Sequence, residues 1–127
     1  MFGISKKSRP EFSELRRISP AKSYMIGLLS QMARTEAASL RVRRSEGLPA
    51  VLSMDGQSMT AEFSEVVNCL KVSSMLNPVS YGHPVDGNFE VSCCDASDAL
   101  ISYTVHTHFD DLGTDPYFEV TIAKKAA

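Results

Sequence analysis

The residues best suited to chemistry lie in one stretch near the C-terminus, His106-Thr107-His108-Phe109-Asp110. His106 and His108 are two residues apart, and in a β-strand that spacing places both imidazoles on the same side. Asp110 continues the alternation. Imidazole nitrogens and carboxylate oxygens are common zinc ligands, so His106, His108 and Asp110 are the candidate metal-binding residues of this chain.

This stretch is similar to the His-x-His-x-Asp-His motif of metallo-β-lactamase-fold hydrolases. It departs from that motif because Asp111 occupies the position of the last histidine, and none of the 16 residues after Asp111 is His or Cys. The later ligands of that family therefore have no counterpart, whereas a functional metal site needs complete inner and outer ligand shells. We expect two solvated histidines on a polar strand face. A metal-dependent enzyme using His106 and His108 ranks last of three functional hypotheses.

Other catalytic patterns are absent from the sequence. It has neither a Gly-x-Ser-x-Gly nucleophile motif nor a GxxxxGK[ST] phosphate loop. Cys69, Cys93 and Cys94 lack Cys-x-x-Cys spacing, and the adjacent pair would point to opposite faces of a strand, which indicates reduced thiols and a cytoplasmic protein. We therefore predict no enzyme, no catalytic residue and no cofactor.

The elements that must position these residues begin with an amphipathic helix. Ser19 is a suitable N-cap and Pro20 suits the first helical position. We expect the helix to end between Glu36 and Ala38. Its apolar residues recur with helical spacing and form one core-facing stripe: Ala21, Tyr24, Met25, Leu28, Leu29, Met32 and Ala33.

Strands and a second helix are predicted to follow. Alternation from Leu40 to Arg43 indicates a half-buried strand. Thr60 is the expected cap of the second helix, whose buried face contains Phe63, Val66, Val67, Leu70 and Leu76. The other predicted elements are a Gly47-Leu48-Pro49 corner, a strand over Val51 to Met54, a hairpin turn at Asp55-Gly56, a short strand over Gln57 to Met59, a helix end at Asn77-Pro78 and a loop over residues 79–88.

The C-terminal third alternates strictly between apolar and polar residues, which predicts an antiparallel β-meander with one buried face. The expected fold class is therefore α+β, with a curved antiparallel sheet packed against two or three helices. The predicted inward residues are Phe89, Val91, Cys93, Ile101, Tyr103, Val105, Thr107, Phe109, Phe118, Val120 and Ile122.

One segment of the chain resembles a known family. The order of Leu28-Leu29, Ala33, Ala38-Ser39, Leu40, Gly47-Leu48-Pro49 and Asp55-Gly56 is similar to that in the N-terminal domain of the bacterial hexameric ATPases of type IV pilus and type II secretion systems, particularly the pilus-retraction motor. The Asp that follows Ser39 in the family is absent, Arg41 replaces its His, Ala50 replaces its second Pro, and the corner is about two residues longer.

The resemblance implies a PAS-like, non-catalytic domain that packs between subunits of a hexamer, with Leu28, Leu29, Leu40, Leu48 and Pro49 as core and corner. The family hydrolyses ATP in a second domain that has a phosphate loop. The first hypothesis is therefore an interaction or oligomerisation module whose partner is a hexameric ATPase or further copies of the chain.

Charge distribution supports an interaction role. Residues 1–44 carry ten Lys/Arg and three acids, net +7, whereas residues 45–127 carry three Lys and twelve acids, net −9. Such bipolarity favours head-to-tail contact between copies or contact with an acidic partner. We assign Arg41, Arg43 and Arg44 to the interface edge on the basis of charge.

The second hypothesis is a small-molecule sensor, because curved sheets covered by helices often enclose a pocket. Met25, Met32, Met54 and Phe63 would line it, although such residues more often fill a core. A cavity above about 300 Å³ would favour this hypothesis.

Length and composition indicate one domain, residues 19–127, preceded by a basic tail and short helix at residues 1–18. The 127 residues are 43% hydrophobic and 22% charged, as in ordinary globular proteins. No apolar run reaches the ~20 residues of a membrane span. The basic cluster Lys6, Lys7, Arg9, Arg16 and Arg17 lacks interleaved aromatics, and the sequence pI of about 5.9 argues against a specific nucleic-acid partner.

Overall fold

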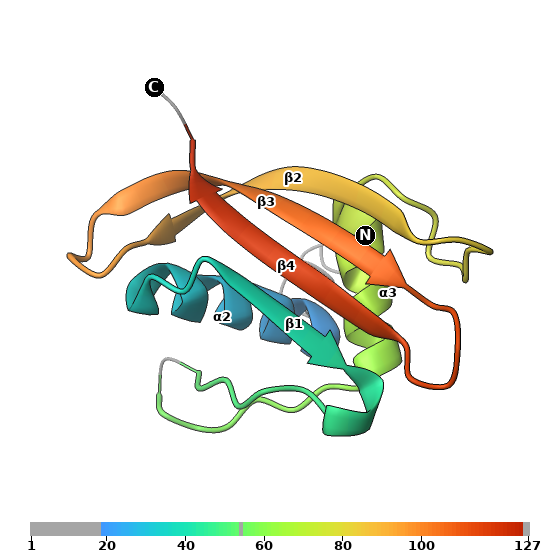
Figure 1. Cartoon of the computed structure of the whole chain (residues 1–127). Coiled ribbons are helices and arrows are strands. Elements are labelled where there is room, and N and C mark those ends of the chain that lie inside the picture. Colours follow the sequence, from blue (N-terminus) through green and yellow to red (C-terminus); the bar gives the residue numbers. More distant parts are fainter. Residues whose placement is uncertain (1–18, 54, 126–127) are drawn as a thin grey trace, which may run out of the picture.

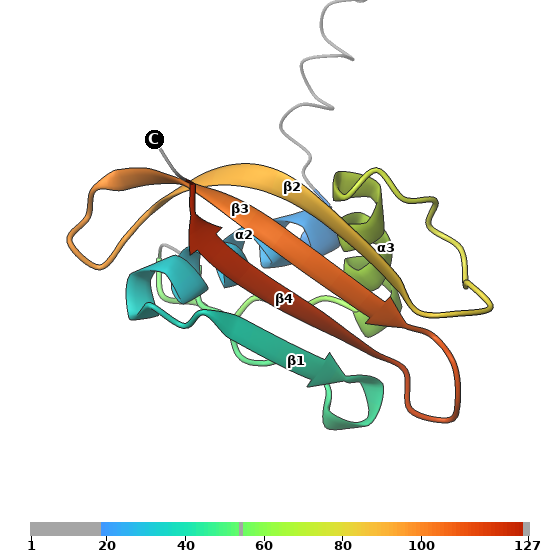
Figure 2. The ribbon, with the colours of Figure 1, turned by 45° about the horizontal axis from the view of Figure 1, so that its top comes forward.

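A computed structural model describes residues 19–53 and 55–125 (Figure 1). The tail and short helix predicted within residues 1–18 lie outside these ranges. The elements in chain order are α2 (Pro20–Thr35), β1 (Ser39–Arg43), the 3-10 turn η1 (Arg44–Glu46), α3 (Phe63–Ser73), β2 (Val85–Cys94), β3 (Leu100–Asp110) and β4 (Tyr117–Lys124). The strands form one antiparallel sheet in the order β1-β4-β3-β2. The curved sheet lies over α2 and α3, which confirms the α+β class (Figures 1 and 2).

Helix α2 has the predicted start and buried face. Ser19 is the N-cap, its side chain accepts a hydrogen bond from the backbone N–H of Lys22, and Pro20 opens the helix. Glu36, in the left-handed conformation, ends it. The whole predicted stripe is buried: Ala21, Tyr24, Met25, Leu28, Leu29, Met32 and Ala33. Helical periodicity therefore identified one side of the core.

The meander from β2 to β4 supplies the other side of the core. Register places Phe89 opposite Val105, Phe109 opposite Phe118, and Val42 of β1 opposite Phe118. All of these residues face the helices, and Val105, Phe109 and Phe118 are fully buried. The opposite face of the sheet, called the outer face below, carries the polar residues of the alternation. The predicted division of the strands into buried and wet faces is therefore confirmed.

Helix α3 is shorter than predicted at both ends. Its N-cap is Glu62, without a side-chain cap, instead of Thr60, because the preceding hairpin keeps the chain extended through Glu62. It ends at Ser73 instead of near Asn77-Pro78. Met75 adopts the left-handed conformation, and the N–H of Leu76 donates a hydrogen bond to the carbonyl oxygen of Lys71. This arrangement ends the helix. Val66, Val67 and Leu70 are buried as predicted, while Phe63 and Leu76 pack against the core.

The two strands predicted on either side of Asp55-Gly56 are reduced to one antiparallel bridge between Leu52 and Ser58. The N–H of Ser53 bonds the carbonyl of Gln57, so the chain does turn back at Asp55-Gly56. The hairpin packs on α2, not in the sheet: a Cβ placed at Gly27 would lie 2.8 Å from Cγ1 of Val51. The predicted loop over residues 79–88 is also too long, because β2 begins at Val85.

Tyr24 joins α2 to the corner and provides a test of the packing. It is 1% exposed and its hydroxyl donates to the carbonyl oxygen of Pro49. Burial raises the pKa of Tyr24 from 10.0 to about 12. The folded state therefore holds the Tyr24 proton more tightly than the unfolded state does. The resulting contribution to the free energy of unfolding is fully present below the unfolded pKa, and it is lost as the pH rises from about 10 towards about 12.

We expect Tyr24→Phe to cost about 1 kcal/mol at neutral pH through the lost hydrogen bond, and to flatten the alkaline fall in stability. Urea unfolding of both proteins between about pH 8 and pH 11 measures both effects. Equal alkaline slopes for the two proteins would contradict this assignment.

Neither α2 nor α3 has the length and apolar character needed to cross a membrane.

Candidate functional site

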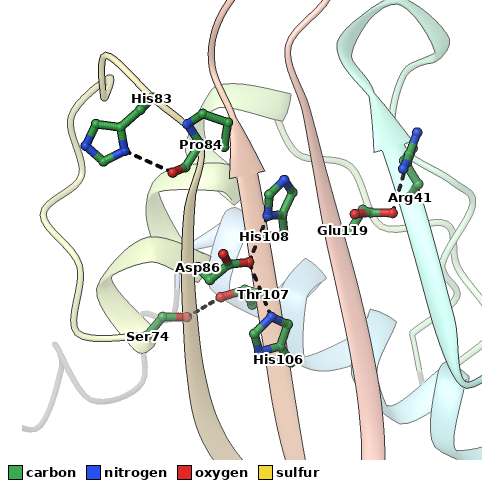
Figure 3. Close-up of polar contacts among 9 residues, drawn as sticks. All are labelled: Arg41, Ser74, His83, Pro84, Asp86, His106, Thr107, His108 and Glu119. Atoms are coloured by element: carbon green, nitrogen blue, oxygen red, sulfur yellow. Dashed lines mark hydrogen bonds and ion pairs between the residues drawn. The ribbon is translucent and has the colours of Figure 1, made fainter.

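Most of the predicted interface and metal-binding residues lie on the outer face of the sheet. Alternation directs Arg41, Arg43, His106 and His108 to this face, and the antiparallel register brings their strands together. We call Arg41, Arg43, Tyr117 and Glu119 the arginine–tyrosine group. We call Asp86, His106 and His108 the histidine group. Figure 3 shows Arg41 beside Glu119 and the two imidazoles on either side of Asp86.

The arginine–tyrosine group spans β1 and β4. Arg41 Nε lies 3.0 Å from a carboxylate oxygen of Glu119, its cross-strand partner. The guanidinium carbons of Arg41 and Arg43 lie 4.7 and 5.5 Å from the ring centroid of Tyr117. Arginine over an aromatic face is held by cation–π attraction. The predicted interface arginines 41 and 43 are therefore held together around one aromatic ring.

The histidine group contains a residue that the sequence analysis missed. Asp86 of β2 lies opposite His108, and its Oδ1 is 2.8 Å from His108 Nδ1 and 3.3 Å from His106 Nε2. Asp110, predicted as the third candidate metal ligand beside the histidines, instead accepts the N–H of Leu112 in the turn after β3. Asp86 was missed because it fell in the predicted loop, so no register with His108 was expected.

Within the described parts of the chain, no three His, Cys, Asp or Glu residues lie in an arrangement that could hold a metal ion. The histidine group is instead an exposed hydrogen-bonded network, in which the side chains of His106 and Asp86 are 53% and 54% exposed. The two groups meet where the His108 and Tyr117 rings lie 6.0 Å apart. Together they form a continuous polar and aromatic surface across all four strands.

Hydrogen bonding to His108, and then the charge of that residue, lowers the pKa of Asp86 below its ordinary 3.8. A carboxylate with a lowered folded pKa stabilises the protein above its unfolded pKa, and this contribution disappears as the pH falls through the folded value. We expect wild-type stability to fall below about pH 4 more steeply than that of Asp86→Asn. Urea unfolding between about pH 2 and pH 6 provides the measurement, and parallel curves would refute the role of Asp86.

Arg44, the third predicted interface arginine, does not join the group. It begins η1, and its backbone N–H donates to the carbonyl of Pro116. Its side chain lines a hollow of about 500 Å³ between α3, residues 78–80 and residues 111–116. The other lining residues are Phe63, Ser64, Val67, Asn68, Lys71, Pro78, Val79, Ser80, Asp111, Gly113 and Pro116.

Lys71 is one of the residues that line this hollow. Its side chain is 2% exposed, and its Nζ lies 2.7 Å from both Asp111 Oδ2 and the carbonyl oxygen of Val79. Asp111 also accepts the N–H of Tyr81. A buried charge is tolerated only when it is paired and hydrogen-bonded. The ion pair and hydrogen bonds of Lys71 and Asp111 therefore link the α3–β2 connection to the end of β3.

The predicted sensor pocket is only partly matched. Met25 and Met32 are buried in the core, and Met32 lines a hollow of about 180 Å³ at the end of α2. Phe63 alone of the predicted set lines the larger hollow, and Met54 lies outside the described residues.

Helical spacing did not predict the burial of Lys71, because Lys is an uncommon core residue.

The three cysteines are free thiols, as predicted. Burial raises the pKa of the Cys93 and Cys69 thiols. Since the thiolate is the reactive form, both side chains behave as small apolar residues.

Comparison of the chain with protein-family models, with curated proteins and with solved structures found no match.

Proposed function

We propose that the chain is a non-catalytic protein-interaction module that docks through the β1 side of its outer face. The observation that carries this proposal is the arginine–tyrosine group, in which the guanidinium groups of Arg41 and Arg43 lie over the ring of Tyr117 at the β1 edge of the sheet. Arginine and tyrosine are enriched among residues that dominate binding energy at protein interfaces. The resemblance to the N-terminal domain of pilus and secretion ATPases suggests a hexameric ATPase or further copies of the chain as the partner, within the cytoplasm.

The net charge of the two halves supports the same proposal. Residues 1–44 are net +7 and residues 45–127 net −9, so the basic part of one copy can attract the acidic part of another. Electrostatic complementarity mainly increases the association rate and the specificity of such contacts.

The test uses two purified binding reactions: self-association by sedimentation velocity, and binding to the motor domain of a pilus-retraction-type ATPase by calorimetry. We expect Arg41→Ala/Arg43→Ala to weaken whichever association occurs by about tenfold or more, as for hot-spot residues. The matched control Lys22→Ala/Arg34→Ala removes the same charge from the exposed side of α2 and should leave binding unchanged. Absence of both associations, or equal loss in both variants, would refute the proposed function.

A second candidate function, small-molecule sensing, is favoured by the hollow of about 500 Å³ that Arg44 and Lys71 help to line. This volume falls within the range of small-molecule sites. Arg44 and Asn68 at its wall suit an anionic group, and Phe63 suits an apolar one. A thermal-shift series with inorganic phosphate, citrate and benzoate tests it: stabilisation that Arg44→Ala abolishes supports sensing, and unchanged melting temperatures with all three exclude these ligands.

A further inference from the structure

Among residues 19–53 and 55–125, no strand pairs with the outer side of β1 or of β2, and the backbone groups on these two edges can be assigned from the register. The N–H of Ile122 bonds the carbonyl of Ala38, and the N–H of Arg44 bonds that of Pro116. Hydrogen-bonded pairs alternate along an antiparallel ladder, so Leu40 and Val42 bond β4. The backbone N–H and C=O groups of Ser39, Arg41 and Arg43 therefore point away from the sheet. We call these three residues the basic edge.

The hydrogen bonds between β2 and β3 show which backbone groups lie on the opposite edge. The N–H of Asp95 bonds the carbonyl of Ala99, one step beyond the Cys94–Leu100 pair. Hydrogen-bonded pairs alternate along the ladder, so the backbone N–H and C=O groups of every second residue of β2 point away from β3. These free groups belong to Asp86, Asn88, Glu90 and Ser92, which we call the acidic edge. All four are exposed.

The two edges are complementary in direction and in face. Four antiparallel strands alternate in direction, so β1 and β2 run oppositely, and a second copy in the same orientation would bring its β2 antiparallel to β1. The free backbone groups on both edges belong to outer-face residues. In such a pairing, the side chains of both edges would lie on the same face of the extended sheet, with the helices of both copies on the other face.

The edges are also complementary in charge. The basic edge carries Arg41 and Arg43, and the acidic edge carries Asp86 and Glu90. Two basic edges or two acidic edges from different copies would place like charges on neighbouring strands, which is unfavourable. A basic edge paired with an acidic edge instead places opposite charges together. Figures 1 and 2 show β1 and β2 at the two margins of the sheet, and no other strand of the described part of the chain lies outside either of them.

We propose that the basic edge of one copy pairs with the acidic edge of the next, so that copies extend one continuous antiparallel sheet head to tail. This inference rests on the proposed function and specifies its partner as a second copy of the chain. A contact between two different surfaces of the same protein is not limited to a dimer, and it closes into a ring or continues as a filament.

Charge reversal with restoration tests the proposal. Arg41→Glu/Arg43→Glu makes both edges acidic, and Asp86→Lys/Glu90→Lys makes both edges basic. We expect each variant alone to self-associate about tenfold or more weakly than wild type, because two attractive cross-strand pairs become repulsive. An equimolar mixture should associate again, since each edge then meets its complement. Sedimentation velocity at low ionic strength measures all four samples, with Lys22→Glu/Glu65→Lys as a charge-swapped control on the helices.

Amide hydrogen exchange supplies a backbone measurement that does not require a variant to fold. Association of the wild type should slow exchange at Ser39, Arg41 and Arg43 and at Asp86, Asn88 and Glu90. Wild type that remains monomeric at millimolar concentration, association without protection of these amides, or a mixture that fails to associate would each overturn the edge pairing. The proposed function would survive these results if the ATPase motor domain still bound, or if copies associated elsewhere, and would fall only if neither association occurred.

Discussion

Replacing Lys71 by methionine is expected to lower the free energy of unfolding by about 3 kcal/mol. Methionine keeps the apolar stem but removes the ammonium group that lies 2.7 Å from Asp111 and from the carbonyl oxygen of Val79. Asp111 is 15% exposed, so its carboxylate loses its ion partner in a place that water reaches poorly. Removing one partner of a buried ion pair costs more than the pair itself contributes, because the other charge remains.

A double-mutant cycle isolates the interaction. We expect Lys71→Met/Asp111→Asn to be more stable than the sum of the single changes predicts, since the double variant leaves no unpaired charge. Urea unfolding followed by circular dichroism measures all four proteins. Arg41→Met serves as a matched control: its ion pair with Glu119 is solvent-exposed, and its loss should cost about 1 kcal/mol or less. Equal losses for Lys71→Met and Arg41→Met would contradict the structural role of Lys71.

The second large effect is expected at Gly87. A Cβ there would lie 2.5 Å from Cβ of Ser74 and 3.2 Å from its carbonyl oxygen. Ser74 cannot move easily, because its hydroxyl bonds that of Thr107, which is fully buried, at 2.8 Å (Figure 3). We therefore expect Gly87→Ala to destabilise the protein by about 1–3 kcal/mol through overpacking, although alanine suits a strand at least as well as glycine does.

Thermal unfolding of three further variants separates steric collision from a general glycine effect. Ser74→Gly removes the colliding Cβ, and combined with Gly87→Ala it should lose less stability than the two single losses together. Gly82→Ala is the matched control, because no atom lies within 4 Å of a Cβ at that position. If Gly82→Ala and Gly87→Ala changed the melting temperature equally, close packing of α3 on β2 would not explain Gly87.

Gly87 also shows why the sequence led to one wrong boundary. Gly82, Pro84 and Gly87 together are typical of a loop, and residues 79–88 were predicted as one. Only a contact 13 residues away in sequence, with Ser74 at the end of α3, requires glycine within β2. The same misplacement hid Asp86, so no carboxylate partner for the two histidines was predicted from β2.

Strict periodicity predicted most of the fold. The stripe of α2 and the alternation in β3 and β4 reflect which side of each element faces water, and this is fixed locally by helix and strand geometry. The same local rule placed Arg41 and Arg43 on one face and His106 and His108 on one face. It could not predict that Tyr117 would lie between the arginines and His108, because that depends on how β1 and β3 pair with β4.

The sequence by itself thus determined the α+β class, the extent of α2, the buried face of the meander strands, and the shared face of Arg41 with Arg43 and of His106 with His108. Only the tertiary structure decided which strands lie at the edges of the sheet, which carboxylate hydrogen-bonds the histidines, and that Lys71 is paired inside the protein. The physical reason is that side-chain direction follows from local backbone geometry, whereas strand order, register and burial of a charge depend on contacts between segments distant in the chain.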